Sequence, residues 1–308
     1  MEPAVIEVSA APLVLDQLDA GRARVGKLIY RGGLVLSSDN AAFGGLSGLA
    51  VSADGAKLLA VGDRGIWFSA TLEYRDGRLS GLADSYLAPM LKWNGQPLDF
   101  GENDAEALAF PPGGGALVAF EDWHRIWRYP FRPTAPFGLL FETTPQPYSL
   151  LPGLKDAPSN GGIEALAALA DGRVLVLSEE LKTGEGILAG WIIRDDHAQA
   201  LGYHYDNGFR PTGMARGPDG DLFIVERSFS LMSGVAVRIM RLKAAKVVPG
   251  AVLRPVEIAR LADPLSVDNM EGIALRRTEQ GRTLIYLISD DNFNPLQRTL
   301  LMMFELAE

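Results

Sequence analysis

The sequence predicts an all-β propeller of five four-stranded antiparallel blades, closed into a ring by an N-terminal strand. Three observations predict this fold: one pattern recurs five times, Asp-Gly turns separate short aliphatic runs, and helical periodicity is weak throughout. Units of this length with several strands each are typical of propellers, in which every repeat forms one blade. Six blades are the alternative, if the first ~25 residues and the segment 123–160 hide a degenerate repeat.

Each repeat begins with an inner strand of small and aliphatic residues, turns, and continues as a second aliphatic strand that ends on an acidic residue. In the third repeat, residues 163–167 precede the turn at Asp171-Gly172, and residues 174–177 lead to Glu179. Asp-Gly between two apolar runs indicates a hairpin because both residues tolerate positive φ. The equivalent inner-strand positions, which are 59, 58, 48 and 59 residues apart, are Ser47, Glu106, Glu164, Thr212 and Glu271.

The two ends of the chain predict how the ring closes. The fifth repeat offers only three strands, the last at 300–306, so residues 28–36 are expected to supply its fourth strand and remove an exposed edge. Residues 1–308 then form a single propeller domain, with residues 1–25 as an N-terminal extension. Segments rich in Pro, Gly and Asn, at 93–103 and 148–160, are expected to be loops over one face.

Composition excludes several classes of function. The 308 residues carry a formal net charge of −9, which argues against nucleic acid or an anionic membrane as a partner and is compatible with cation binding. No run approaches the ~18 apolar residues of a membrane span, so no membrane insertion is expected. The chain has no cysteine and contains no phosphate-binding glycine loop. The expected partner is a small, anionic molecule.

Three glutamates at the equivalent inner-strand position are the main candidates for a functional site. The innermost strands of a propeller line its channel, so Glu106, Glu164 and Glu271 are expected to converge there. Close carboxylates repel one another in a low dielectric, and a bound cation or a raised pKa relieves this repulsion. Hard oxygen ligands suit a divalent cation, Ca²⁺ first and Mg²⁺ second. Amides near these glutamates that could add carbonyl oxygens are Asn103, Asn160 and Asn269.

A second acidic set ends the second strand of each repeat: Asp63, Glu121, Glu179, Glu226 and Asp290. For this set the favoured role is structural, as acceptors of backbone N–H bonds that hold blades together, and the inner glutamates could have that role too.

Arginines follow two acids of this second set. Arg64 and Arg227 either pair with those acids or bind an anionic substrate through a bidentate fork, and pairing is the more common role. Arg210 and Arg298 are similar but weaker candidates. Among the three histidines, only His124 is placed as an acid or base, and packing is its more common role.

At these residues the chain resembles the propeller family described as "esterase-like activity of phytase". The resemblance spans about 44–306 and rests on an ordered set of strings: GGLSGLA (44–50), GDRG (62–65), DAEALA (104–109), IEALA (163–167), LFIVERSF (222–229), NMEGIA (269–274) and ISDDNF (288–293). The chain departs from the family at Ala105 and Ala107, where proline and glycine are more common, and at Ser228, where Asp is common. The resemblance implies an exported hydrolase, periplasmic or secreted after loss of a signal peptide; a cytoplasmic location stays open.

Three functions fit these observations. In the first, Glu106, Glu164, Glu271 and Asn269 hold the cation of a phosphoester or ester hydrolase, with Glu164, Asp63, Arg64 and Arg227 as its catalytic and anion-binding groups. In the second, the protein is a calcium-dependent lactonase, which shares the acidic ring and does not need the arginines. In the third, it is a non-catalytic binding or scaffold propeller whose acids only hold the blades together.

Overall fold

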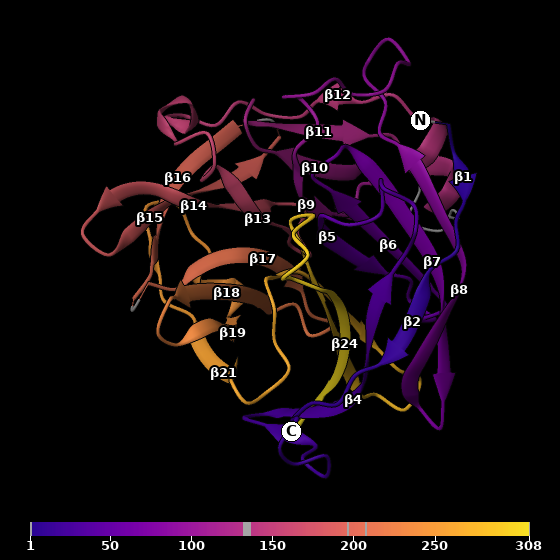
Figure 1. Cartoon of the computed structure of the whole chain (residues 1–308). Helices are drawn as coiled ribbons and strands as arrows, with labels where there is room; N and C mark the ends of the chain where they lie inside the picture. The colour runs from indigo at the N-terminus through magenta and orange to yellow at the C-terminus, as the bar shows by residue number, and fades with distance from the viewer. Residues whose placement is uncertain (1, 132–136, 196, 207, 308) are drawn as a thin grey trace.

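A computed structural model shows five antiparallel sheets arranged as the blades of a closed propeller (Figure 1). It describes residues 2–131, 137–195, 197–206 and 208–307. The five blades predicted from the repeats are confirmed. The segment 123–160 adds no sixth blade in its described part, because β11 (Arg125–Tyr129) and β12 (Gln146–Pro147) complete the second blade.

Each blade has a strand at the channel and three further strands outward. The innermost strands are β5 (Leu46–Val51), β9 (Ala105–Ala109), β13 (Ile163–Ala168), β17 (Arg210–Arg216) and β22 (Met270–Arg277). The second strands are β6 (Lys57–Gly62), β10 (Ala116–Phe120), β14 (Val174–Gly184), β18 (Leu222–Ser230) and β23 (Thr283–Ser289). The third strands are β7 (Ile66–Arg75), β11, β15 (Ile187–Arg194), β19 (Gly234–Leu242) and β24 (Thr299–Leu306). The fourth strands are β8 (Arg78–Pro89), β12, β16 (His197–His204), β21 (Val256–Ala262) and β4 (Leu28–Ser37).

The ring closes through the predicted pairing of the two ends of the chain. Strand β4 pairs antiparallel with β24, from Leu36 opposite Thr299 to Leu28 opposite Leu306, and the two lie side by side in Figure 1. The segment before β4 adds short edge strands rather than standing apart from the blades. Of these, β1 (Ala4–Val5) pairs with β8, whereas β2 (Ser9–Pro12) and β3 (Arg24–Val25) pair with β4. The two-residue β20 (Val252–Leu253) extends β16.

The core consists of five apolar clusters, and each cluster joins residues from two neighbouring blades. Successive side chains of a strand point to opposite faces, so a strand between two neighbours needs apolar residues at every position. In β18, Phe223 and Val225 pack toward blade 5, whereas Leu222 and Ile224 pack toward blade 3. This geometry explains the continuous aliphatic runs in the second strands of the sequence.

The blades approach closely at the channel because small residues follow the motif positions, as expected. A Cβ atom on Gly213 would clash with the Glu271 carbonyl oxygen, and one on Gly272 would clash with the Ser47 carbonyl oxygen. Glycine at these two positions brings the inner strands of blades 4, 5 and 1 together. Within the described ranges, no helix is long and apolar enough to cross a membrane.

Candidate functional site

All five innermost strands carry a β-bulge at the motif position. The ladder between β9 and β10 skips Glu106, that between β13 and β14 skips Glu164, and that between β22 and β23 skips Glu271. In the same way, the ladder between β5 and β6 skips Ser47, and the ladder between β17 and β18 skips Thr212. A bulge leaves its extra residue outside the ladder and re-aims the side chain. Here it turns the three glutamates into the channel, where they line one pocket.

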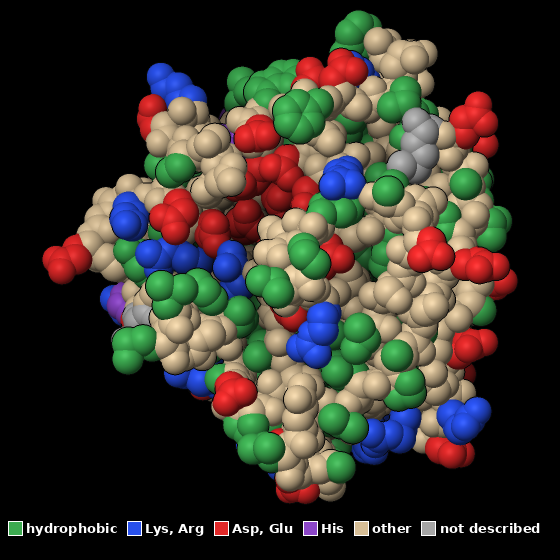
Figure 2. Space-filling view, in the orientation of Figure 1, with side chains coloured by type: hydrophobic (Ala, Val, Ile, Leu, Met, Phe, Trp, Pro, Cys, Tyr) green, Lys and Arg blue, Asp and Glu red, His purple; other side chains and the backbone are tan. Residues whose placement is uncertain are grey.

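The channel opens on one face as a pocket of about 1230 Å³, and Figure 2 shows it as a hollow filled with acidic side chains. The carboxylates that line it are Asp63, Asp104, Glu106, Glu121, Glu164, Glu179, Asp263, Asp268, Glu271 and Asp290. Arg227 and Arg298 are the basic residues among the described part of the lining. The convergence predicted for the three inner glutamates is therefore present, within a larger acidic site.

Below the glutamates the channel is closed by aliphatic side chains. Leu108 and Leu166 lie two residues beyond Glu106 and Glu164, and they line a second cavity, of about 830 Å³, at the opposite end of the channel. Leu49 and Met214 line it with them, and all four of these aliphatic side chains are buried. The acidic ring therefore lies above an apolar floor, which offers the carboxylates no polar partner on that side.

Burial dominates the electrostatics of the inner glutamates. Glu164 and Glu271 are buried, and Glu106 is partly accessible from the pocket. Loss of solvation, followed by repulsion from neighbouring carboxylates, holds the pKa of all three well above the usual range for glutamate. Burial and mutual repulsion therefore both favour the protonated form of these glutamates.

The acids at the ends of the second strands surround this ring. Burial, as the largest cause, raises the pKa of Asp63 to about 8, that of Glu121 to about 7 and that of Asp290 to about 6. For Asp63, the nearby Asp290 carboxylate adds to the rise. Glu121 also shares a hydrogen bond with Glu164. This contact joins the second acidic set to the inner ring.

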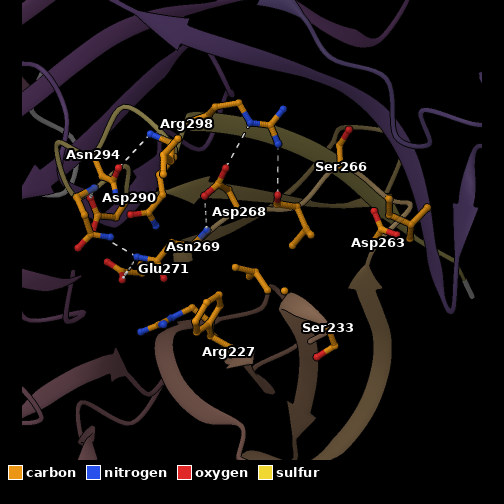
Figure 3. Close-up of a pocket in the computed structure, with 18 of the residues that line it drawn as sticks. Arg227, Ser233, Asp263, Ser266, Asp268, Asn269, Glu271, Asp290, Asn294 and Arg298 are labelled. Carbon is orange, nitrogen blue, oxygen red and sulfur yellow. Dashed lines mark hydrogen bonds and ion pairs between the residues drawn. The ribbon is translucent and has the colours of Figure 1, made fainter. Parts of the chain in front are cut away.

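Oxygen atoms without donors lie beside the ring. Asp63 Oδ1 and Asn269 Oδ1 are buried and accept no hydrogen bond within the described part of the chain. Asn269 Nδ2 donates to Glu271 Oε1 over 2.7 Å (Figure 3). Carboxylate and carbonyl oxygens are the ligands that Ca²⁺ and Mg²⁺ prefer, so the residues present fit a hard divalent cation.

No group of three or more acidic or histidine side chains in the described ranges already has the geometry of a metal site. The carboxylates instead hydrogen-bond to one another, as Glu121 does to Glu164 and Asp104 to Glu106. A cation would therefore have to displace these contacts between carboxyl groups.

Two acids of the second set hold neighbouring blades together. Glu121 Oε1 accepts the backbone N–H of Gly161 at 2.9 Å and of Gly162 at 2.5 Å, which joins blade 2 to blade 3. Glu226 is fully buried and does not line the pocket; it accepts hydrogen bonds from Tyr203 Oη at 2.5 Å and from Arg238 Nε. Glu121 thus accepts backbone N–H groups, as expected for this set, whereas Glu226 joins blades 3 and 4 through the side chain of Tyr203.

The structure separates the two arginines proposed to bind an anion. Arg227 lines the pocket, with Nη2 3.3 Å from Glu179 Oε1. Arg64 does not line it: its exposed guanidinium lies 3.3 Å from the centroid of the Phe293 ring and donates to the Ala41 carbonyl oxygen over 2.8 Å. Asp63 and Arg64 both lie in the turn that follows β6, from which Asp63 faces the pocket and Arg64 stacks on Phe293 outside it. We therefore place Arg64 outside the site.

Other candidates divide in the same way. Asn160, Asn269 and Arg298 line the pocket, whereas Asn103, Arg210 and His124 do not. His124 Nε2 lies 2.9 Å from the Pro158 carbonyl oxygen. This contact with the backbone agrees with the structural role that is more common for such a histidine.

Sequence reasoning missed several members of the site. Asp104 precedes Glu106 by two residues and Asp268 precedes Glu271 by three, and a search for acids just before each inner strand would have found both. Asp268 pairs with Arg298, whose Nε lies 3.3 Å from Asp268 Oδ2 (Figure 3). The segment treated as an N-terminal extension also reaches the pocket wall, through Gln17 and Leu18. No local signal in the sequence predicts that contact.

With its bulged inner strands and acidic channel mouth, the molecule is a propeller with a carboxylate-lined pocket. The chain belongs to the phytase-like family described as "esterase-like activity of phytase", whose model matches residues 41–293. No curated protein matches it.

Several solved structures are similar to this chain at low sequence identity. An α-L-arabinofuranosidase from Podospora anserina is 9% identical with a TM-score of 0.52, over 98% of both chains. A gluconolactonase from Xanthomonas campestris is 13% identical with a TM-score of 0.46, over 99% of this chain and 98% of that one. A protein of unknown function from Dyadobacter fermentans is 14% identical with a TM-score of 0.44, over 99% and 98%. At such identities the likeness concerns the fold alone.

Proposed function

We propose that the protein is a hydrolase that cleaves an ester bond, phosphoric or carboxylic, at a divalent cation held in the channel pocket. The observation that carries the proposal is the convergence of Glu106, Glu164 and Glu271 from three blades onto an apolar floor. Burying like charges together is costly unless protons or a cation offset them. Blade anchoring needs no such cluster, since Glu226 joins blades 3 and 4 through a single carboxylate.

The residues of the pocket divide into binding and proton-transfer roles. Glu106, Glu164 and Glu271, with Asn269 Oδ1, would hold the cation, with Ca²⁺ favoured over Mg²⁺. When bound, the cation would polarise the ester oxygen and lower the pKa of a water molecule. Asp63, whose pKa is raised to about 8, suits proton transfer near neutral pH. Arg227, at the pocket wall, is placed to stabilise negative charge that develops on the substrate.

Calcium titration tests the cation site directly. We expect calorimetry on chelator-stripped protein to show Ca²⁺ binding, and the Glu164→Gln variant to bind at least tenfold more weakly. Glu180→Gln is the matched control, because Glu180 lies in β14 of the same blade and is outside the pocket lining. Absence of binding by the wild-type protein, or equal binding by both variants, would overturn the site.

Turnover tests the reaction. The panel is p-nitrophenyl phosphate, p-nitrophenyl acetate and a γ-lactone, each with and without EDTA. We expect at least one substrate to be cleaved, with the activity lost on adding EDTA and in Glu164→Gln. Calcium binding without turnover of any substrate would favour the non-catalytic binding propeller. Export, which the family resemblance implies, is part of this proposal and is tested by fractionating cells that express the full-length gene.

A further inference from the structure

The pocket extends beyond the acidic ring as a groove between blades 4 and 5. Its walls are the β18–β19 hairpin, which contributes Phe229 and Val235, and the loop before β24, which contributes Leu296. Its floor is the segment 263–269, with Leu265 and Val267, seen in Figure 3 between the labelled Asp263 and Asn269. Leu18 contributes to one wall. We call these six apolar residues the apolar groove.

The apolar groove presents large side chains to solvent at the mouth of an acidic pocket. Leu18, Phe229 and Leu296 are 84%, 62% and 90% exposed. Beyond them, the tip of the β18–β19 hairpin carries Leu231 and Met232, which are almost fully exposed. Figure 2 shows apolar side chains gathered beside the acidic hollow. Exposed apolar side chains that border a pocket are typical of a binding site.

The groove is held in shape by backbone contacts. The Ser266 N–H donates to the Leu15 carbonyl oxygen over 2.7 Å, and Asp16 forms a β-bridge with Leu265, so the N-terminal segment is fixed to the floor. Phe229 and Val235 lie opposite one another in the β18–β19 ladder. The apolar wall is therefore part of the folded sheet and its fixed connections.

The charges of the pocket limit what can bind. Ten carboxylates line it, and both of its arginines already pair with carboxylates, Arg227 with Glu179 and Arg298 with Asp268. The described lining offers a multiply charged anion no unpaired cationic side chain, and its ionised carboxylates repel one. This balance argues against the small anionic substrate expected from the sequence, and it favours an uncharged one.

We propose, building on the hydrolase function above, that the substrate is an uncharged ester with an extended apolar arm that lies in the apolar groove. The ester group then lies at the ring of glutamates, and the arm runs outward between blades 4 and 5. Hydrolysis adds one water: its oxygen bonds to the acyl carbon, the ester C–O bond breaks, and one proton of the water goes to the released alcohol. The acid product then loses its proton to solvent.

Chain length tests the proposal. We expect the wild-type kcat/KM for p-nitrophenyl octanoate to exceed that for p-nitrophenyl acetate at least tenfold. Phe229→Asn should lower the octanoate value at least fivefold more than the acetate value, mainly through KM. Val256→Asn is the control, because Val256 is an exposed apolar residue of the same blade outside the groove. Equal wild-type values for the two esters would overturn the groove and leave the hydrolase function intact. Cleavage of p-nitrophenyl phosphate but of neither carboxylic ester would also overturn the groove and leave the hydrolase function intact.

A binding measurement separates the groove from catalysis. The uncharged dye N-phenyl-1-naphthylamine should gain fluorescence with the wild-type protein and with Val256→Asn, and bind at least fivefold more weakly to Phe229→Asn. If no ester is cleaved, the hydrolase function fails, and this titration alone decides whether the groove binds apolar groups. Equal dye binding by all three proteins would overturn the proposal that the apolar groove binds apolar groups.

Discussion

Ser47 donates a hydrogen bond of 2.8 Å to Glu271 Oε2 across the closure of the ring. Ser47 lies in β5 of the first blade and Glu271 in β22 of the last, each at the bulge of its strand. The bond favours the ionised carboxylate, but burial is the larger effect and keeps the pKa of Glu271 well above its usual range. Thr212, the other motif residue without a carboxylate, donates to the Met270 carbonyl oxygen over 2.8 Å. The two hydroxyl residues thus connect blade 5 to its neighbours and leave three carboxylates in the ring.

The raised pKa values predict how stability depends on pH in the absence of divalent cations. In the folded protein Asp63, Glu121 and Asp290 titrate at about 8, 7 and 6, above their ordinary values. Between the ordinary and the folded pKa, the folded protein binds more protons than the unfolded chain, so the free energy of unfolding falls as pH rises. One fully titrating group contributes about 1.4 kcal/mol per pH unit, so from pH 5 to pH 8 we expect a loss of several kcal/mol.

Urea denaturation in EDTA at each pH unit measures this slope. Calcium should restore stability at pH 8, where it no longer competes with protons, and should have little effect at pH 5. Stability that rises with pH over this window would contradict the protonated ring.

The separation of the two arginines predicts unequal effects of substitution. Arg227→Ala removes a positive charge from the pocket wall, and we expect it to lower kcat/KM at least tenfold on whichever ester is cleaved. Arg64→Ala removes only the stacking on Phe293 and one bond to a backbone carbonyl, so it should stay within twofold of wild type. Steady-state kinetics of the two variants tests this difference. A loss of kcat/KM in Arg64→Ala as large as that in Arg227→Ala would show that Arg64 belongs to the site.

The close approach of blades 4 and 5 predicts a strict requirement at one glycine. Gly213→Ala puts a methyl group against the Glu271 carbonyl oxygen, a backbone atom that cannot move without shifting β22. We expect the free energy of unfolding to fall by about 2–3 kcal/mol. Gly113→Ala, in a turn with no atom near the added methyl group, should change it by less than about 0.5 kcal/mol. Chemical denaturation of both variants checks the contrast; equal stabilities would show that the inner strands tolerate separation.

The contacts of Glu121 predict that its acceptor oxygen matters more to stability than its charge. Glu121→Ala leaves the N–H groups of Gly161 and Gly162 without their acceptor and should cost about 2–4 kcal/mol. Glu121→Gln keeps an acceptor oxygen and should cost less than half as much. Denaturation midpoints at pH 6 provide the measurement, and a glutamine variant as unstable as the alanine variant would contradict the role as a blade anchor.

Most of the fold could be predicted from the sequence because its signals are local. Asp171-Gly172 and the other turns mark hairpins, and the alternation of Phe223 and Ile224 between two interfaces appears in sequence as an uninterrupted aliphatic run. The inner glutamates could be predicted too, because equivalent positions of a repeat meet at the axis of a ring. The bulges that aim them could not, since a single extra residue in a ladder has no distinct composition.

The sequence by itself determined the repeat with its five copies, the strand that closes the ring and the three glutamates at its hub, because short-range turn chemistry and a repeated pattern specify them. The structure decided for five blades over six. Only the tertiary structure decided which neighbouring acids and arginines share the pocket. Side chains one residue apart, such as Asp63 and Arg64, point in opposite directions, so nearness in sequence does not place them together. Conversely, Leu18 and Leu296 are far apart in sequence but line the same groove, because the closed ring sets side-chain direction and long-range packing.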